Sequence, residues 1–220
     1  MIILNTPHNP TATILHKDDI DQLSAIVKNQ DILILSDEVY EHLIYDGEVH
    51  HSMARYAELR QRSFIVASFG KLFHATGWKV GYTVAPELLT REIRKAHQFI
   101  TFSVNTPMQL ALAEYLGNPE NYLSLGKFYQ QKRDFFINEI KGSSLKPLPC
   151  FGSYFQLLSY ESVSEKSDIE MAEWMTKEMK LAPIPVSAFY KDNSDHKLLR
   201  FCFAKGEETL QKAGKILRVI

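Results

Sequence analysis

A lysine that follows a short apolar stretch is the residue of this sequence with the clearest potential for chemistry. Lys71 comes shortly after residues 64–67 (FIVA), which are expected to form a buried strand, and a run of small and polar residues follows it. A lysine held in a cleft at the end of a strand can lose its proton and attack a carbonyl carbon to form a Schiff base. Most lysines are solvated surface charges, so this interpretation depends on the neighbouring segments.

Two other polar segments follow apolar runs in the same way. Residues 2–4 (IIL) lead into residues 5–11 (NTPHNPT), and residues 32–35 (ILIL) lead into residues 36–40 (SDEVY). Continuous apolar runs are typical of parallel strands that helices cover on both faces. The carboxyl ends of parallel strands meet at one edge of the sheet, where ligands bind in α/β proteins. Residues 18–30 have apolar side chains at helical spacing, which predicts a strand–helix–strand unit.

The polar side chains of these segments suit a pyridine cofactor. Asp37 can hold a protonated ring nitrogen, which makes the ring an electron sink, as in pyridoxal phosphate (PLP) chemistry. Tyr40 can present its hydroxyl from the same turn, and the Asn9 amide can donate to a ring oxygen. Taken singly, Asp37 predicts a helix cap and Asn9 a simple turn. Together with Lys71, they favour a PLP site.

The same segments resemble a known family. Residues 5–12 (NTPHNPTA), 36–40 (SDEVY), 68–71 (SFGK), 76–82 (TGWKVGY) and 199–205 (LRFCFAK) occur in the order found in the fold-type I, class I/II aminotransferases. Within that group, the sequence resembles the bacterial methionine aminotransferases and the kynurenine/glutamine aminotransferases. No single motif is sufficient, but their combination is specific. Ala12 stands where many relatives have glycine, which predicts a turn without a positive φ.

The resemblance implies a role for each residue around the cofactor ring. Lys71 would form the Schiff base with PLP and then move the proton of the substrate Cα. Asp37 would hold the pyridinium nitrogen, and Tyr40 and Asn9 would hydrogen-bond the phenolic oxygen of the ring.

The resemblance also implies residues that bind the phosphate and the substrate. Ser68 and Lys79 would contact the phosphate, although many relatives have arginine at the position of Lys79, and lysine supplies a point charge without the guanidinium fork. Arg200 would bind the substrate α-carboxylate, assisted by Asn9. An unpaired charge inside the apolar strand around Arg200 would be costly, which favours a binding role over a surface charge.

The function implied by the resemblance is PLP-dependent transamination. The amino donor would be methionine, glutamine or an aromatic amino acid, and a 2-oxo acid would accept the amino group. One alternative is a PLP-dependent β-lyase that acts on cysteine conjugates, because that reaction starts with the same proton abstraction. A second alternative is a non-catalytic, truncated remnant with weak PLP binding. The family is expected to form homodimers.

The implied fold is α/β, the PLP-transferase type I fold, with a mostly parallel sheet, flanking helices and a smaller α+β C-terminal domain. The sequence begins inside the family pattern, so we expect the N-terminal part of the cofactor domain, about 150 residues, to be missing. We expect residues 1–116 to form the rest of the PLP-binding large domain and residues 117–220 the small domain. Hydrophobic spacing predicts helices over 87–102, 108–116, 121–140, 168–181 and 207–219, strands over 153–159 and 198–204, and loops over 146–149 and 182–185.

The composition excludes several other classes of function. Of the 220 residues, 45% are hydrophobic, and the formal net charge of −1 gives no attraction to nucleic acid or to anionic membranes. No apolar run is long enough to span a bilayer. Cys150 and Cys202 match no disulfide or metal pattern, and the adjacent pair His50 and His51 lacks the spacing of metal ligands. We therefore expect free thiols, no metal ion and a cytoplasmic location.

Overall fold

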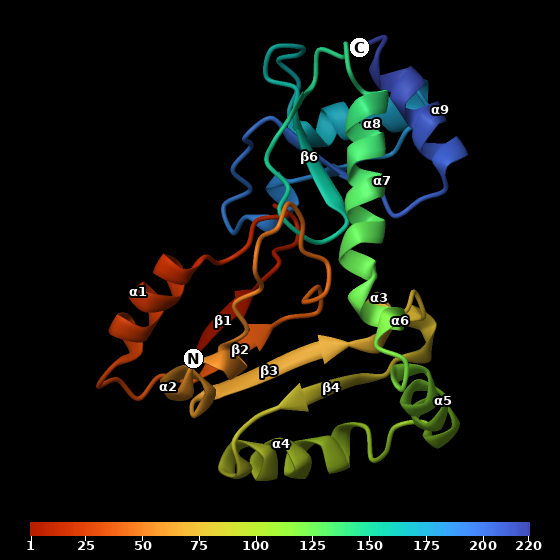
Figure 1. The fold of residues 1–220 in the computed structure, drawn as a ribbon. Helices are drawn as coiled ribbons and strands as arrows, with labels where there is room; N and C mark the ends of the chain where they lie inside the picture. The colour runs from red at the N-terminus through yellow and green to blue at the C-terminus, as the bar shows by residue number, and fades with distance from the viewer. The chain divides into compact units, whose positions relative to one another are not determined.

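The structure, a computed structural model, describes all residues from Met1 to Ile220 (Figure 1). The chain divides into two compact units. The first consists of Met1–Pro7 and Ile14–Leu125, and the second of His8–Thr13 and Gly126–Ile220. The division of the chain into domains at residue 116 stays a prediction. None of the helices is both long enough and apolar enough to cross a membrane.

A four-stranded sheet forms the centre of the first unit (Figure 1). Its strands lie in the order β1 (Ile2–Asn5), β2 (Ile34–Asp37), β3 (Ser63–Ser68) and β4 (Gly81–Val84). The first three strands are parallel, and β4 is antiparallel to β3. The parallel register aligns the carboxyl ends, because Asn5 pairs with Asp37 and Asp37 with Val66. This arrangement confirms the predicted mostly parallel α/β sheet.

Short helices between the parallel strands cover one face of this sheet. They are α1 (Lys17–Val27), the 3₁₀ helix η1 (Met53–Arg55) and α2 (Ala57–Arg60). Apolar side chains from these helices and from two strands form a buried core of Ile20, Val27, Ile34, Met53, Leu59 and Ile65. The side chain of Ile3 alternates to the other face and is 71% exposed. Within these 220 residues, helices therefore cover β1 on one face only.

The rest of the first unit follows β3. Its elements are α3 (Phe69–Leu72), the 3₁₀ helix η2 (Thr76–Trp78), β4, α4 (Glu87–Ile100), α5 (Thr106–Leu116) and α6 (Glu120–Leu123). The single helix predicted over residues 121–140 is wrong, because α6 ends before Ser124 and a separate helix, α7 (Leu125–Glu139), follows. The Ser124 hydroxyl donates to the Glu120 carbonyl oxygen at 2.6 Å. Such local bonds of serine compete with regular helical geometry, which is consistent with the interruption.

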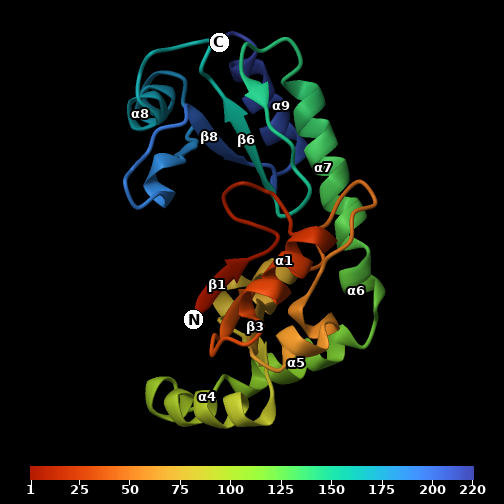
Figure 2. The ribbon, with the colours of Figure 1, turned by 90° about the vertical axis from the view of Figure 1, so that its left-hand side faces the viewer.

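The second unit contains an antiparallel sheet of four strands. Their order is β5 (Lys146–Pro147), β6 (Phe155–Ser159), β8 (Leu198–Cys202) and β7 (Ile184–Pro185), and β6 and β8 lie side by side in Figure 2. Sequence analysis predicts loops over 146–149 and 182–185, but each of these segments contains a two-residue edge strand. Proline is compatible with edge strands because it need not donate to a neighbour.

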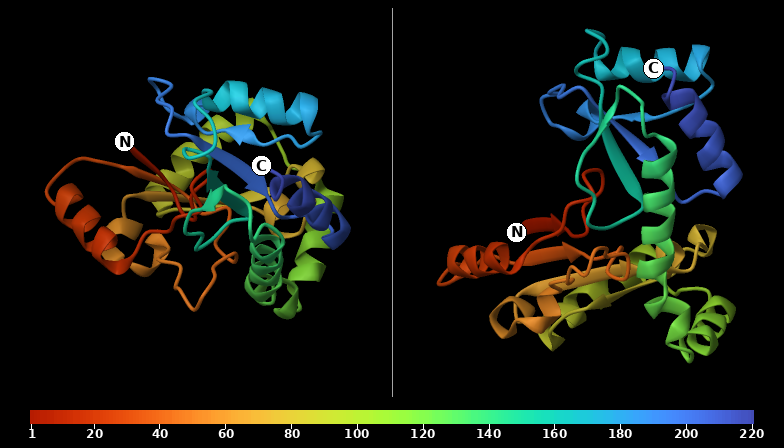
Figure 3. Two further views of the ribbon diagram at one scale, coloured as in Figure 1. Left: turned by 90° about the horizontal axis from the view of Figure 1, so that it is seen from above. Right: turned by 45° about the horizontal axis from the view of Figure 1, so that its top comes forward.

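Three helices complete the second unit: most of α7, then α8 (Asp168–Glu178) and α9 (Glu207–Leu217). A further 3₁₀ helix, η3 (Ser187–Phe189), follows β7. The helix α9 lies beside the carboxyl end of α7 (Figure 3), where Arg218 Nη1 donates to the Glu139 carbonyl oxygen at 2.7 Å. The approach is close, because a Cβ added to Gly214 would lie 2.6 Å from Glu139 Cβ.

The segment His8–Thr13 corrects one expectation of the sequence analysis. Ala12 has a φ of 59°, so the turn does require a positive φ. The Ala12 N–H donates to the His8 carbonyl oxygen at 2.8 Å, and its own carbonyl oxygen accepts hydrogen bonds from Phe151 N at 2.9 Å and Gly152 N at 3.1 Å. These bonds hold a non-glycine residue in a conformation that costs roughly 1–2 kcal/mol.

Candidate active site

The lysine predicted to be catalytic lies directly after β3. Ser68 ends this strand and caps α3, with its hydroxyl oxygen accepting a hydrogen bond from Gly70 N at 3.2 Å. Lys71 follows within this short helix and is partly exposed. Gly70 is required by a close approach, because a Cβ at this position would lie 2.8 Å from the Thr76 Cα. The residues beside Lys71 therefore fold the chain back tightly after the strand.

The segment that returns antiparallel to β3 brings a second glycine close to the strand. Gly81 pairs with Ser68, and a Cβ on Gly81 would lie 2.6 Å from the carbonyl oxygen of Ala67. Lys79 lies just before this pair, has a φ of 56°, and is exposed. Close packing thus explains Gly70 and Gly81, whereas a Cβ on Gly77 would meet no atom within 4 Å. Lys79 is exposed, so its ammonium group is accessible to solvent or to a ligand.

Asp37 occupies the carboxyl end of β2. Its Oδ1 accepts a hydrogen bond from Val39 N at 3.2 Å. Burial raises the pKa of Asp37, and the neighbouring carboxylate of Glu38 adds to this effect, while the positive charge of Lys71 opposes it. Asp37 is therefore a partly desolvated carboxylate within electrostatic range of Lys71, and a cationic partner would stabilise its ionised form.

The backbone of Asp37 is fixed by the end of the neighbouring strand. Its carbonyl oxygen accepts hydrogen bonds from Asn5 Nδ2 and from Thr6 N, both at 3.0 Å. Tyr40 lies in the turn that follows and is only 2% exposed. The Tyr40 carbonyl oxygen accepts from Leu43 N at 2.8 Å, which closes this turn. Asp37 and Tyr40 thus lie on a short, well-fixed stretch of backbone.

Sequence analysis missed a buried pair next to Asp37. Glu38 Oε2 lies 2.8 Å from His50 Nε2, and Glu38 Oε1 accepts from Ser36 Oγ at 2.8 Å and from Met53 N at 3.0 Å. In the sequence, His50 stands out only as one of two adjacent histidines that lack the spacing of metal ligands. The sequence does contain a hint of this pair. Glu38 directly follows Asp37 at the end of an apolar strand, and a carboxylate that is buried there needs hydrogen-bond partners.

Tyr82 and Glu41 form another polar contact of the first unit. The Tyr82 hydroxyl donates to Glu41 Oε1. Burial and this hydrogen bond raise the pKa of Tyr82, so the phenol keeps its proton. This contact links β4 with the turn that contains Tyr40.

In the second unit, the structure brings together the two residues predicted to bind the substrate. Arg200 lies at the centre of β8, and its Nη1 donates to Asn9 Oδ1 at 2.6 Å. The Arg200 Cζ lies 4.1 Å from the ring centroid of Phe155 and 5.2 Å from that of Phe189. These rings hold the guanidinium group by cation–π contacts. Neither aromatic residue was predicted, because their proximity to Arg200 depends on strand pairing.

The site residues thus fall into two observed groups, one in each unit. In the first unit, Asp37 lies near the charge of Lys71, and Ser68 lies at the start of the same short helix as Lys71. In the second unit, Arg200 and Asn9 are hydrogen-bonded. The first group can hold a cationic ring nitrogen and offer an amine, and the second can bind a carboxylate.

Comparisons with known proteins agree with these features. The sequence model of the family described as "Aminotransferase class I and II" matches residues 1–216. The chain is 50% identical over 219 residues to the methionine aminotransferase of Escherichia coli (strain K12), in an alignment that covers 99% of this chain and 57% of that protein. It is 35% identical over 240 residues to kynurenine–oxoglutarate transaminase 1 of Mus musculus, covering 99% of this chain and 56% of that protein.

Solved structures show the same likeness. A structure from Escherichia coli that is described as having a methionine aminotransferase function superposes with a TM-score of 0.97 at 50% identity, covering 99% of this chain and 57% of that one. The N-succinyldiaminopimelate aminotransferase of Mycobacterium tuberculosis superposes with a TM-score of 0.93 at 28% identity, covering 99% and 57%. The chain therefore spans little more than half the length of these relatives.

Proposed function

The chain belongs to the family of class I and II aminotransferases, and from this premise we propose that it binds PLP and takes part in transamination between an amino acid and a 2-oxo acid. The relatives named above are a methionine aminotransferase and a kynurenine–oxoglutarate transaminase. For this chain we propose methionine, glutamine or an aromatic amino acid as the amino donor. We also propose a homodimer in the cytoplasm as the working form.

The residues of the first unit fit the cofactor. Asp37 is a partly buried carboxylate whose pKa is raised by burial, so a protonated pyridine nitrogen would be a favourable partner. When bound, PLP supplies an electron sink for the negative charge that develops at the substrate Cα. Asp37 would hold the ring nitrogen in its protonated form. Tyr40 would donate a hydrogen bond to the phenolic oxygen of the ring.

Lys71 would hold the cofactor covalently through Nζ and then move a proton at the substrate Cα. Its place in a short helix after β3 suits this role, since the backbone around it is fixed by the packing of Gly70 and Gly81. A fixed backbone limits the positions that the Lys71 amine can sample, which favours proton transfer when the substrate Cα is held within its reach. Ser68 and Lys79 would contact the phosphate group through a hydroxyl and an ammonium group.

Arg200 would bind the α-carboxylate of the substrate. Its guanidinium group has five donor hydrogens, one of which Nη1 donates to Asn9 Oδ1 at 2.6 Å. The rings of Phe155 and Phe189 restrict the orientation of the guanidinium plane. A planar, oriented fork suits bidentate binding of a carboxylate.

The observation that carries the proposal is the alignment of strand ends in the first unit. Asp37 pairs with Val66 of β3, and Lys71 follows that strand, so the carboxylate and the amine lie at the same edge of a parallel sheet. Ligands bind at this edge in α/β folds. The likeness to solved aminotransferases supports the same assignment.

Product analysis tests the proposal. The 220-residue chain is incubated with PLP, a 2-oxo acid and, in turn, methionine, glutamine, phenylalanine and a cysteine conjugate. Transamination converts each donor to its own oxo acid, and Lys71→Ala abolishes this conversion. A β-lyase would release pyruvate and ammonia from the cysteine conjugate instead. No conversion of any donor would contradict the proposal and favour the non-catalytic alternative.

A further inference from the structure

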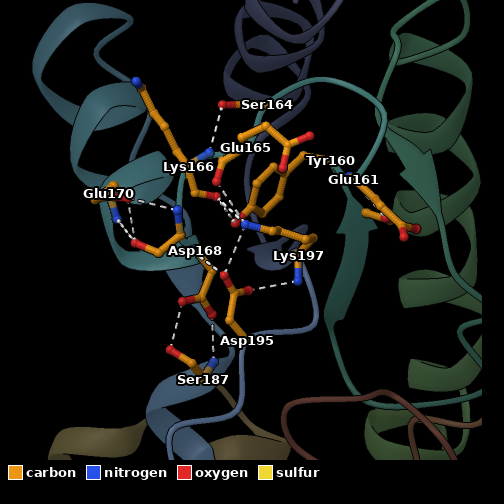
Figure 4. A network of polar contacts seen from close by, with 12 residues as sticks. Tyr160, Glu161, Ser164, Glu165, Lys166, Asp168, Glu170, Ser187, Asp195 and Lys197 are labelled. Carbon is orange, nitrogen blue, oxygen red and sulfur yellow. Dashed lines mark hydrogen bonds and ion pairs between the residues drawn. The ribbon is translucent and has the colours of Figure 1, made fainter.

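A buried carboxylate in the second unit has no role in the proposed chemistry. Asp168, the first residue of α8, is 1% exposed. Its two oxygens bind one residue, because Oδ2 accepts from Ser187 N at 2.6 Å and Oδ1 accepts from Ser187 Oγ at 2.7 Å (Figure 4). Burial of a carboxylate is costly unless it is fully hydrogen-bonded, and these two short, charge-assisted bonds meet that need.

The start of α8, which carries Asp168, is itself anchored by Asp195. Asp195 Oδ2 accepts from Asp168 N at 3.1 Å, and Lys197 Nζ lies 3.4 Å from Asp195 Oδ2. Lys197 Nζ also donates to the carbonyl oxygens of Glu165 at 3.0 Å and Lys166 at 2.7 Å (Figure 4). Asp168 is therefore a fixed point from which Ser187 is held.

Ser187 in turn begins the helix η3, which ends at Phe189. The strand before η3, β7, pairs with β8, and Ile184 of β7 lies opposite Arg200 of β8. The ring of Phe189 lies 5.2 Å from the Arg200 Cζ. A one-turn helix has few internal bonds, so the position of Phe189 depends on what holds its first residue.

We propose that Asp168 is a positioning residue for Arg200, acting through Ser187 and Phe189. The carboxylate fixes Ser187, Ser187 fixes η3, and η3 places the Phe189 ring against the guanidinium group. This keeps the Arg200 fork in the orientation that binds a carboxylate. The inference rests on the proposed function for the statement that the bound group is a substrate carboxylate.

The first test follows Arg200 itself and requires neither cofactor nor turnover. The Nε–Hε signal of Arg200 is recorded by ¹⁵N NMR in the full chain and assigned by its loss in Arg200→Lys. Asp168→Asn and Ser187→Ala should both shift this signal, because the Phe189 ring current changes. Ser187→Thr keeps the hydroxyl group, so the Arg200 signal should stay at its wild-type chemical shift in this variant.

Glu170→Gln is the matched control for charge in the first turn of α8. Glu170 Oε2 accepts only from Ser167, from its N and its Oγ, both at 2.8 Å, and does not contact Ser187. This variant should leave the Arg200 signal in place. An Arg200 signal at the wild-type position in Ser187→Ala would overturn the inference, even if Asp168→Asn failed to fold.

The second test measures carboxylate binding. The probe is 4-(methylthio)butanoate, which has no amino group and cannot be transaminated. Asp168→Asn and Ser187→Ala should weaken its binding about fivefold to tenfold, as expected for the loss of one or two hydrogen bonds that orient the clamp. Glu170→Gln should bind as the wild type does. If Arg200→Lys weakens the binding of the probe but Ser187→Ala does not, the inference about Asp168 is wrong and the proposed role of Arg200 stands. If Arg200→Lys itself binds the probe as the wild type does, the proposed binding of carboxylates by Arg200 is wrong.

Discussion

His50 Nε2 lies 2.8 Å from Glu38 Oε2, in a pair whose side chains are 13% and 1% exposed. A carboxylate only accepts hydrogen bonds, so the histidine hydrogen lies on Nε2. The pair joins the segment directly after β2, which lies between Asp37 and Tyr40, to the chain just before η1. A pair next to two proposed cofactor ligands ties their backbone to the core of the first unit.

Acid should destabilise the first unit through Glu38. Burial alone would raise the pKa of Glu38, but hydrogen bonds with His50, Ser52 and Met53 outweigh it and lower the pKa below its usual 4.5. A lowered pKa in the folded state gives stability that is present above pH 4.5 and is lost as the pH falls through the folded value.

Glu38→Gln tests this pH dependence. The variant should lose about 1–3 kcal/mol of unfolding free energy at pH 7, because hydrogen bonds to a charged acceptor are lost. It should also show a flatter decline of unfolding free energy below pH 4.5 than the wild type. Urea unfolding between pH 3 and pH 7 measures both effects, and parallel curves for the two proteins would show that Glu38 makes no such contribution.

The pH dependence of stability that Asp37 contributes should be opposite to that of Glu38. Burial raises its pKa, so the folded state disfavours the ionised form. Its contribution to stability is therefore most favourable at low pH and declines as the pH rises from the ordinary value of 3.8 through the raised one. Asp37→Asn should make the chain without cofactor more stable at pH 7 and should weaken PLP binding, since the full charge opposite the ring nitrogen is lost.

Urea unfolding of the wild type and of Asp37→Asn, with and without PLP, measures both the gain in unfolding free energy and the loss of PLP binding. Residues at binding sites commonly reduce the stability of the protein in this way. Val39→Ala serves as a control on the same turn, since it keeps the backbone N–H that donates to Asp37 Oδ1. If Asp37→Asn lowered stability without PLP and left PLP affinity unchanged, the assignment of Asp37 as a ring-nitrogen ligand would be wrong.

Arg200→Lys should reduce the binding of carboxylates more than the binding of PLP. Lysine keeps the charge but loses the planar fork and the packing between Phe155 and Phe189. We expect carboxylate affinity to fall roughly tenfold, which is about 1.4 kcal/mol. Arg91→Lys is the control, because Arg91 forms only an exposed ion pair with Glu92. Calorimetric titration with 4-(methylthio)butanoate and with PLP separates the two effects.

Much of the fold follows from local patterns in the sequence. The apolar runs before residues 5, 36 and 68 predict three parallel strands, and β1, β2 and β3 confirm them. The strand around Arg200 also agrees with its apolar neighbours. These features depend on hydrophobic periodicity, which acts over a few residues.

Other features depend on contacts that a local pattern does not contain. Ala12 adopts a positive φ because Phe151 and Gly152 hydrogen-bond its carbonyl oxygen from a distant part of the sequence. The edge strands β5 and β7 form by pairing with β6 and β8, although their prolines predict loops. The partner of Glu38 likewise becomes evident only when the chain returns to it at His50.

The candidate site shows the same division. Lys71, Asp37 and Asn9 could be predicted as candidates from their residue type and their position after apolar strands. The aromatic rings around Arg200 and the hydrogen bonds between Asp168 and Ser187 could not, because they depend on the packing of strands and helices that lie far apart in the sequence. Residues that perform chemistry are restricted in type, but residues that orient them are restricted mainly by shape and hydrogen bonding.

The proposed function requires Lys71 to be the residue that holds the cofactor. The most direct measurement is borohydride reduction of the chain after incubation with PLP, followed by proteolysis and mass spectrometry. We expect the added mass to lie on the peptide that contains Lys71. Lys71→Ala should remove this mass, and Lys79→Ala should leave it on Lys71. A label on any other lysine, or an equal label spread over many lysines, would contradict the account.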